Sequence, residues 1–129
     1  MNPQSITYHA SSRTLELCYT DGSDALLPAE LLRVYSPSAE VRGHSESERK
    51  LQTGMKHIAI DSMESIGNYA LRIVFSDGHD TGIYSWDYLA DLCHHQEEYW
   101  QKYLGELQSA NASRLPTIPV GHWKPEVDA

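Results

Sequence analysis

A histidine between two aspartates stands beside a tight turn in the second half of the chain, at Asp77-Gly78-His79-Asp80. Imidazole titrates near neutral pH and is a common metal ligand. His79 is therefore a candidate metal ligand, or a general base that Asp77 or Asp80 would orient. Two simpler explanations stay open, because turns favour aspartate at the position of Asp77 and because a lone histidine is more often structural or merely exposed.

No recognised catalytic or metal-binding motif accompanies His79. The sequence has no Cys-x-x-Cys pair, no glycine-rich phosphate loop and no nucleophile elbow. His94 and His95 are adjacent, so they lack the i, i+4 spacing with which one helix face holds a metal. Arg42 and His44 lie in a glycine-containing loop, which is either a small polar site or a loop braced by its own hydrogen bonds. An enzyme using His79 thus lacks a recognisable nucleophile, and a binding function is favoured over it.

The elements that position His79 are predicted to be a β-hairpin and a helix. Apolar residues alternate with others along 71–75, which is the period of a strand with one buried face. Asp77-Gly78 then predicts a type I′ turn, in which both residues have positive φ. The chain returns along a second strand, and Ser85 is expected to cap a helix that begins at Trp86. We expect this frame to hold the imidazole firmly and to leave it reachable from solvent.

The first half of the chain contains a similar unit. A strand at 15–20 is followed by Asp21-Gly22, a return run at 25–27 and a helix through 30–33, with Pro28 expected at the first helical position. The matching residues, 56 positions apart, are Leu15 and Leu71, Leu17 and Ile73, Tyr19 and Phe75, Asp21 and Asp77, Gly22 and Gly78, and Asp24 and Asp80, while Ser23 takes the place of His79. Either the unit was duplicated, or the same turn chemistry produced two similar hairpins, and the sequence leaves both explanations open.

These two strand–Asp-Gly–strand–helix units predict an α+β fold with an antiparallel sheet. Further strands are expected at 6–8 and 57–63, and Gly67-Asn68 turns the second of these into the hairpin that carries His79. An amphipathic C-terminal helix is predicted after the second hairpin, with a bend at His94-His95.

We expect residues 1–107 to form one domain and residues 108–129 to be an extended tail that contains prolines. Ile118 and Trp123 are the expected anchors of this tail on the body. The polar run 45–50 is expected to be a solvated loop or a short helical turn.

Length and charge narrow the classes of function. At 129 residues the chain suits one domain, and its net charge of −8 argues against a general grip on nucleic acid or anionic lipid while remaining compatible with a basic partner surface. Cys18 and Cys93 lie in apolar-patterned stretches and are expected to be reduced, buried thiols. The chain opens without a basic or apolar leader and has no run of about 18 apolar residues, so we expect a cytoplasmic protein with neither a membrane nor a nucleic-acid partner.

Three stretches give the sequence a family resemblance. They are residues 32–41 (LRVYSPSAEV), 66–73 (IGNYALRI) and 75–89 (FSDGHDTGIYSWDYL), together with Gly43-His44. Over roughly residues 5–95 the chain resembles the gamma-butyrobetaine hydroxylase-like N-terminal domain family. In that family the domain precedes the oxygenase domain of gamma-butyrobetaine and trimethyllysine hydroxylases. It also occurs alone in bacteria as a domain of unknown function, and is appended to some P-loop ATPases that carry iron–sulfur clusters.

The resemblance also implies a zinc position, which this sequence alters. The hydroxylase form holds zinc with three cysteines near its first helix and one histidine after the second hairpin turn, and His79 matches that histidine. The cysteine positions are occupied by Ser36, Ser38 and Val41. None of these residues supplies a thiolate. We therefore expect the family zinc to be absent, or rebuilt from other ligands such as Glu40 and His44, and no other cofactor is assigned.

The expected function is a non-catalytic binding or accessory module with a protein partner, and the resemblance links it to iron–sulfur or other metalloprotein maturation. The oxygenase catalytic half has no room in 129 residues, so an enzyme is less expected than a binding protein. The expected binding residues are Arg42, His44, Asp77, His79, Tyr84 and Trp86. The alternative is a small metal-binding protein that uses His79 with non-cysteine ligands. The sequence identifies neither the partner nor the oligomeric state.

Overall fold

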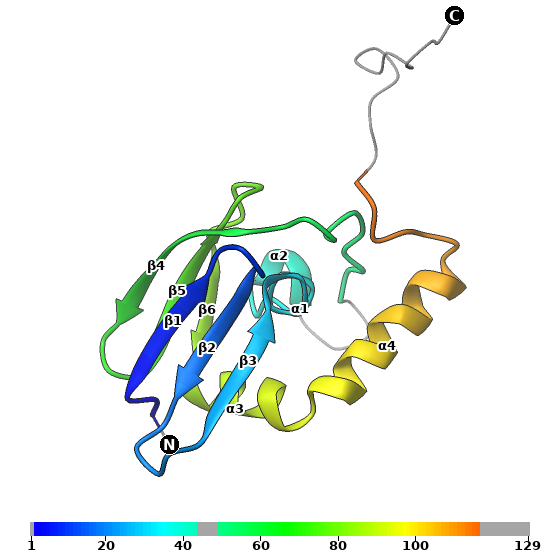
Figure 1. The fold of residues 1–129 in the computed structure, drawn as a ribbon. Helices are drawn as coiled ribbons and strands as arrows, with labels where there is room; N and C mark the ends of the chain where they lie inside the picture. The colour runs from blue at the N-terminus through cyan, green and yellow to red at the C-terminus, as the bar shows by residue number, and fades with distance from the viewer. Residues whose placement is uncertain (1, 44–48, 117–129) are drawn as a thin grey trace, which may run out of the picture.

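Two three-stranded antiparallel sheets, each followed by a pair of helices, make up the fold (Figure 1). The structure is a computed structural model and describes residues 2–43 and 49–116. The first sheet contains β1 (Ser5–His9), β2 (Thr14–Cys18) and β3 (Asp24–Pro28), followed by α1 (Ala29–Val34) and α2 (Ala39–Arg42). The second contains β4 (Ile60–Ile66), β5 (Ala70–Phe75) and β6 (Gly82–Ser85), followed by α3 (Trp86–His94) and α4 (Gln96–Ser109). The predicted α+β class is confirmed, and each unit forms a sheet of its own.

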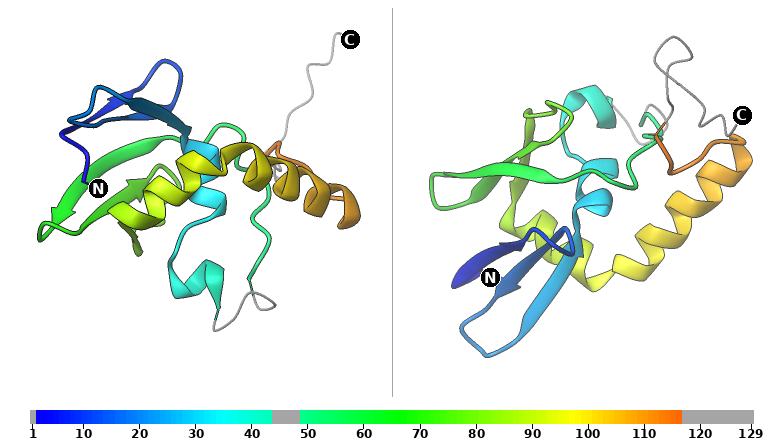
Figure 2. Two further views of the ribbon diagram at one scale, coloured as in Figure 1. Left: turned by 90° about the horizontal axis from the view of Figure 1, so that it is seen from below. Right: turned by 45° about the horizontal axis from the view of Figure 1, so that its top comes forward.

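One core lies between the two sheets and the helices. The inward positions of the central strands, Leu15 and Leu17 in β2 and Ile73 and Phe75 in β5, are 0% exposed. The helices add Leu31, Leu32, Leu89, Leu92 and Tyr103. Burying a side chain of this size contributes about 1.5–3 kcal/mol, so the core fixes the hairpins and helix ends around the candidate site. The left view of Figure 2 shows the two sheets as separate layers.

The two hairpin turns have the same geometry, which differs from the predicted type I′ turn. In the second hairpin the N–H of Gly78 donates to the carbonyl of Phe75, and the N–H of Phe75 donates to the carbonyl of His79. Gly22 and Tyr19 make the corresponding bonds in the first hairpin. Only the glycines have positive φ, 89° at Gly22 and 88° at Gly78. This is the pattern of a three-residue loop, in which a type I turn is followed by one left-handed residue.

The returning strand of the second hairpin contains one residue more than that of the first. In the first sheet the pairing runs without a break from Cys18 opposite Asp24 to Thr14 opposite Pro28. In the second sheet Phe75 bonds to His79, but Ile73 already pairs with Gly82. An inserted residue of this kind bends a strand and redirects its side chains. Equivalent positions are therefore 56 residues apart before the turn and 57 apart at the helix starts, Ala29 and Trp86.

The two helices that follow the hairpins start directly at the ends of the strands, and of the two only α3 has a side-chain cap. The side chain of Ser85 accepts a hydrogen bond from the N–H of Tyr88, which confirms the predicted cap. Pro28 was expected at the first helical position, but it is the N-cap, with φ −65° and ψ 142°. Its fixed φ suits extended backbone as well as helix, and Pro28 still pairs with Thr14 in the sheet, so α1 begins one residue later.

The C-terminal segment follows the prediction in its helices. The bend at His94-His95 is confirmed, because α3 ends at His94 and α4 begins after His95. Helix α4 continues to Ser109, and the next residues lie against the body, where the guanidinium of Arg114 bonds the buried carboxylate of Glu30. The predicted anchors Ile118 and Trp123, and most of the polar run 45–50, lie outside the described residues. No helix in the described ranges is long and apolar enough to cross a bilayer.

Candidate functional site

His79 and Ser36 form a buried side-chain pair between the two halves of the fold. The Nε2 atom of the imidazole lies 2.8 Å from the Oγ atom of the serine. His79 is 8% exposed and Ser36 is 3% exposed, so the expectation of a ring reachable from solvent is wrong. The segment between α1 and α2 lies over the ring, and the side chain of Phe75 lies beside it with ring centroids 6.1 Å apart. The histidine is buried, and it is held at the Ser36-Pro37 segment.

Further hydroxyl groups and a glycine complete this cluster. The Oγ atom of Ser38 lies 2.6 Å from Oγ1 of Thr81, and the N–H of Ser38 donates to Oγ of Ser36. A Cβ atom at Gly82 would lie only 2.7 Å from Oγ of Ser36, so glycine is required at this position. We call these residues, Ser36, Ser38, His79, Thr81 and Gly82, together with the neighbouring ion pair of Arg33 and Asp77, the serine–histidine corner. It joins the α1–α2 segment to the residues that follow the β5–β6 turn.

Arg33 attaches the same turn to helix α1. Its Nε atom donates to Oδ2 of Asp77 at 3.0 Å, and Oδ1 of Asp77 accepts from the backbone N–H of His79 at 3.1 Å. The Arg33 side chain is only 9% exposed. Asp77 therefore stabilises the turn through the backbone of His79 and also pairs with the guanidinium of Arg33. Nothing in the local sequence pattern distinguishes Arg33 from a surface residue, so it is absent from the predicted site residues.

The electrostatic environment favours a neutral imidazole. Burial, followed by the positive charge of Arg33, lowers the pKa of His79 below its usual value. The carboxylates of Glu40, Asp77 and Asp80 oppose this shift, and Oε2 of Glu40 lies 3.7 Å from Nδ1 of the ring. A neutral ring either donates to Ser36 or accepts from it, depending on which nitrogen carries the proton.

The other predicted site residues are distributed around the corner rather than gathered in it. Tyr84 lies beneath it, fully buried, and its hydroxyl donates to the carbonyl of Leu32. Trp86 lies at the other end of β6, where its Nε1 donates to the carbonyl of Asn68. Arg42 is exposed, with its guanidinium carbon 5.4 Å from the ring centre of Tyr88. His44 lies outside the described residues.

The corner contains the atoms of a nucleophile and a base in a closed arrangement. A serine hydroxyl within hydrogen-bond reach of an imidazole is the geometry of nucleophilic catalysis. Yet Oγ of Ser36 already bonds the imidazole and the N–H of Ser38, and Ser36 is only 3% exposed. The hollow that it lines has a volume of about 70 Å³, which is space for about two water molecules rather than for a substrate. Asp77, considered as an orienter, bonds the backbone of His79 and Arg33 instead of the ring. This geometry holds two segments together.

The donor set of the corner does not fit a zinc ion. Two of the family's cysteine positions, Ser36 and Ser38, do lie in the same corner as His79, but they offer neutral hydroxyls. Val41 offers only hydrocarbon and is 2% exposed. Structural zinc requires thiolate, imidazole or carboxylate ligands, usually four. Within residues 2–43 and 49–116 no three His, Cys, Asp or Glu side chains are grouped so that they could hold a metal.

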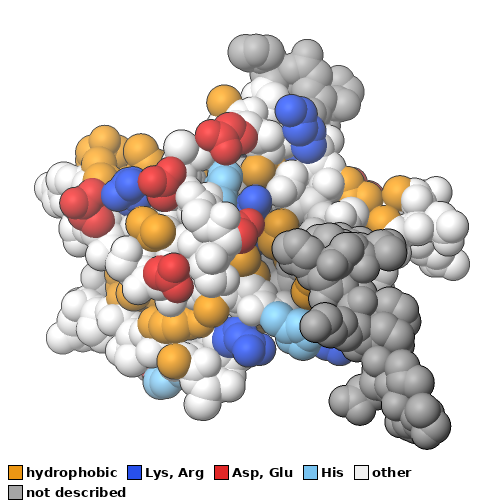
Figure 3. Space-filling view, turned by 90° about the horizontal axis from the view of Figure 1, so that it is seen from above, with side chains coloured by type: hydrophobic (Ala, Val, Ile, Leu, Met, Phe, Trp, Pro, Cys, Tyr) orange, Lys and Arg blue, Asp and Glu red, His pale blue; other side chains and the backbone are white. Residues whose placement is uncertain are grey.

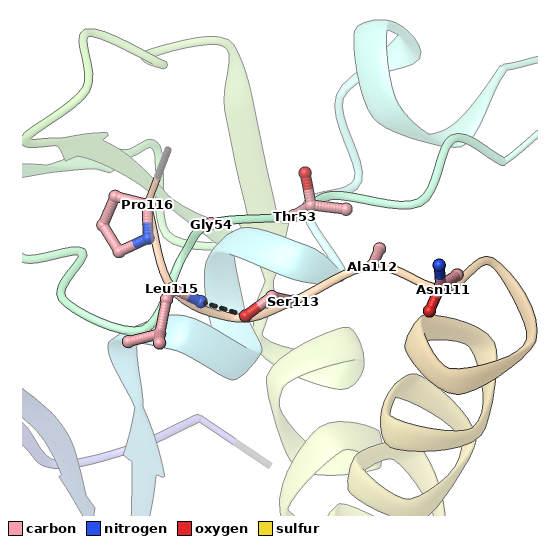
Figure 4. A pocket seen from close by; sticks show the side chains of 7 residues that line it. All are labelled: Thr53, Gly54, Asn111, Ala112, Ser113, Leu115 and Pro116. Carbon is pink, nitrogen blue, oxygen red and sulfur yellow. Dashed lines mark hydrogen bonds between the residues drawn. The ribbon is translucent and has the colours of Figure 1, made fainter. Parts of the chain in front are cut away.

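A hollow elsewhere on the molecule offers less chemistry. It has a volume of about 490 Å³ and lies where the segment after α4 passes Thr53 and Gly54 (Figure 4). Its other lining residues are Asn111, Ala112, Ser113, Leu115 and Pro116. None of these side chains titrates near neutral pH. The hollow therefore contains no base that could activate the hydroxyls of Thr53 and Ser113.

Comparison with known sequences decides the family. The family model described as gamma-butyrobetaine hydroxylase-like, N-terminal, matches residues 6–90. The chain belongs to the gamma-butyrobetaine hydroxylase-like N-terminal domain family. The matched segment runs from β1 into α3 and includes the whole serine–histidine corner. None of the curated proteins matches the chain.

Solved structures extend the family likeness beyond the matched segment. A protein solved by NMR in solution is 44% identical with a TM-score of 0.78, and the alignment covers 92% of this chain and 94% of that one. A second NMR structure is 43% identical with a TM-score of 0.77, covering 95% and 92%. A crystal structure from Acidithiobacillus ferrooxidans, of a DUF971-family protein of unknown function, is 35% identical with a TM-score of 0.60, covering 70% and 91%. The family domain thus occurs on its own, with unknown function.

Proposed function

We propose that this chain is a non-catalytic binding module that contacts a partner protein through the exposed rim of the serine–histidine corner. The observation that supports this most is the buried hydrogen bond between the side chains of Ser36 and His79. Such a pair holds the surrounding segments rigidly, and a rigid surface loses little entropy on binding. The residues around the corner that a partner can reach are Glu40, Asp80 and Thr81, and we call them the rim.

The rim is acidic and well exposed. The side chain of Glu40 is 67% exposed and that of Asp80 is 50% exposed, on the two segments that the corner joins. Thr81 is exposed between them. On the face seen from above, positive and negative side chains alternate without one broad patch of either sign (Figure 3). Asp80 already pairs with Arg72 at 3.3 Å, so the partner surface that suits this rim is polar, with a basic group opposite Glu40.

The cellular setting belongs to the same proposal. Cys18 and Cys93 are free thiols, which suits a reducing compartment such as the cytoplasm. Both are only half-buried, so the fully buried position expected for them is not what forms. The family resemblance makes iron–sulfur or other metalloprotein maturation the first process in which to search for the partner.

Affinity capture from native lysate with matched charge variants tests the proposal. The double variant Glu40→Gln and Asp80→Asn removes two rim charges, while Glu97→Gln and Glu98→Gln remove two exposed charges from α4. We expect the wild type and the α4 variant to recover the same protein and the rim variant to lose it. Equal recovery by all three chains would reject the rim as a contact surface.

A second candidate function is metal binding by His79 and Glu40. The supporting observation is the distance of 3.7 Å between Nδ1 of His79 and Oε2 of Glu40, which leaves two potential ligands facing each other. Elemental analysis of untagged protein separates the two functions. A stoichiometric metal that is lost in both His79→Ala and Glu40→Gln supports the metal-binding function, and metal-free, folded protein supports the binding module.

A further inference from the structure

A groove lies between the β2–β3 hairpin and helix α3, and its volume is about 570 Å³. Its lining residues are Tyr19, Asp21, Ser23, Asp24 and Ala25 from the hairpin, and Ala90, Cys93 and His94 from the helix. All of these positions are described, and none lies in the serine–histidine corner or its rim. We call it the hairpin groove.

The hairpin groove is the counterpart, in the other half of the fold, of the serine–histidine corner. Positions before and in the turn are equivalent at a spacing of 56 residues, and helix positions at a spacing of 57, as the helix starts show. The equivalent pairs are Asp21 and Asp77, Ser23 and His79, Ala90 and Arg33, and Cys93 and Ser36. The turn of the second hairpin thus packs against the α1 segment, and the turn of the first hairpin packs against α3 in the same way.

Two smaller side chains open the groove where the corner is filled. In the corner, the guanidinium of Arg33 reaches across to Asp77 and the ring of His79 fills the space beside it. In the groove, the equivalent residues are Ala90 and Ser23, whose side chains stop short. The space that Arg33 and His79 fill in the corner is therefore open in the hairpin groove.

The residue differences between the two halves also leave the hairpin groove without the arginines that lie near Asp77 and Asp80. In the second sheet Arg72 pairs with Asp80 at 3.3 Å, whereas the residue equivalent to Arg72 is Glu16. Asp24 therefore faces a carboxylate where Asp80 faces a guanidinium. In the described part of the chain, no Lys or Arg lies within ion-pair distance of Asp21 or Asp24.

One oxygen of Asp21 is available in this arrangement. Its Oδ1 accepts from the N–H and the hydroxyl of Ser23, at 2.9 Å and 2.6 Å, and these bonds lower the pKa of Asp21. Its carboxylate is therefore ionised at neutral pH. The groove thus combines an ionised carboxylate with a wall formed in part by Tyr19 and Ala25, which suits a cation on an apolar stem.

We propose that the hairpin groove binds an arginine side chain of a partner protein, placed as Arg33 is placed in the corner. A guanidinium carries five N–H donors in a fixed planar fork. One of them can bond the free oxygen of Asp21, as Nε of Arg33 bonds Asp77, while others remain for Asp24, an arrangement that a compact ammonium does not reproduce. The corner itself is the internal example, because its Asp77 holds such a group at 3.0 Å. This inference concerns a second surface and goes beyond the function proposed for the rim.

Titration of the full chain with a blocked tripeptide, acetyl-Gly-Arg-Gly-amide, tests the inference. Backbone amide signals of residues 21–25 and 90–94 should shift saturably in ¹H–¹⁵N spectra. The citrulline peptide, which has the same shape without the charge, should leave them unchanged. A lysine peptide that binds as tightly as the arginine peptide, or shifts confined to other residues, would overturn the proposal.

Matched variants connect the effect to the groove. Asp21→Asn with Asp24→Asn should weaken binding by about tenfold or more, as expected for loss of charge-assisted bonds. Asp61→Asn with Asp87→Asn removes two exposed charges outside the groove and should leave binding unchanged. Equal binding by both double variants would overturn the proposal.

A variant that places an arginine in the groove, at the position equivalent to Arg33, tests the comparison between the groove and the corner. Ala90→Arg supplies the missing guanidinium from within, so it should abolish peptide binding and raise the melting temperature. Peptide binding by Ala90→Arg at wild-type strength would overturn the proposal. The rim variant Glu40→Gln and Asp80→Asn should bind the arginine peptide normally, so failure of the groove and failure of the rim give different results.

Discussion

Oγ of Ser36 and Nε2 of His79 lie 2.8 Å apart although 43 residues separate them in the chain. Both side chains are buried, so removing one leaves the other without its partner in the interior. Such a loss costs about 1–3 kcal/mol of the free energy of unfolding. We expect Ser36→Ala to lower it by this amount, measured by urea denaturation. Ser62→Ala on the exposed side of β4 is the control, and equal effects of the two changes would contradict a special role for Ser36.

The buried imidazole makes stability depend on pH. Burial first, and then Arg33, lower the pKa of His79 from 6.5, against the opposing effect of Glu40, Asp77 and Asp80. Because the unfolded chain then takes up the proton more readily than the folded chain, the contribution of the neutral ring is present above pH 6.5 and is lost as the pH falls toward the folded pKa. We expect the free energy of unfolding to fall more steeply from pH 7.5 to 5.5 in the wild type than in His79→Gln. Parallel slopes would contradict this.

The sequence predicted the elements better than their contacts. Alternation of apolar residues located β5, and Ser85 marked the start of α3, because both signals are local. The turn type was wrong, because Asp-Gly suits both a two-residue and a three-residue loop, and the hydrogen bond of Gly78 to Phe75 decides between them.

The burial of His79 could not be predicted from the local sequence pattern, for a different reason. It depends on a segment 43 residues away, whose path over the ring is set by the packing of α1. The same holds for Arg33, whose partner Asp77 is 44 residues away. The inserted residue near Thr81 is visible only when the two hairpins are compared after folding.

The ion pair between Arg33 and Asp77 should be strongly coupled. Arg33 is 9% exposed and Asp77 is 30% exposed, so removing one partner leaves a poorly solvated charge. Breaking a buried pair costs about 3–5 kcal/mol, and the exposure of Asp77 reduces this to about 2 kcal/mol. We expect Arg33→Met to cost this much, and a double-mutant cycle with Asp77→Asn to give a coupling above about 1 kcal/mol. Additive effects would contradict the pair.

Restoring the family's cysteines should create a zinc site. The triple change Ser36→Cys, Ser38→Cys and Val41→Cys supplies the thiolates that the corner lacks, beside His79. We expect elemental analysis to find about one zinc per chain in this variant and substoichiometric zinc in the wild type. Adding His79→Ala to the triple variant should weaken zinc binding. Stoichiometric zinc in the wild type that disappears in His79→Ala would contradict the proposed donor set.

Gly82 limits the size of the corner, and its substitution tests how closely the corner is packed. A Cβ atom there would lie 2.7 Å from Oγ of Ser36 and 3.1 Å from Cε1 of Tyr84, so Gly82→Ala should destabilise the fold by about 1–3 kcal/mol. Gly105, in the exposed face of α4, has nothing within 4 Å of the same added atom. Gly105→Ala should therefore stabilise the fold, by about 0.5–1 kcal/mol.

The origin of the Gly82 effect can be separated from a general loss of packing. Because the shortest contact is with Oγ of Ser36, removing that oxygen should relieve most of the strain. The combination of Gly82→Ala with Ser36→Ala is then expected to cost at least about 1 kcal/mol less than the sum of the single changes. Thermal and urea unfolding of the four chains measure this coupling. A sum equal to the two separate losses would mean that Gly82 is constrained by the ring of Tyr84 and not by the serine.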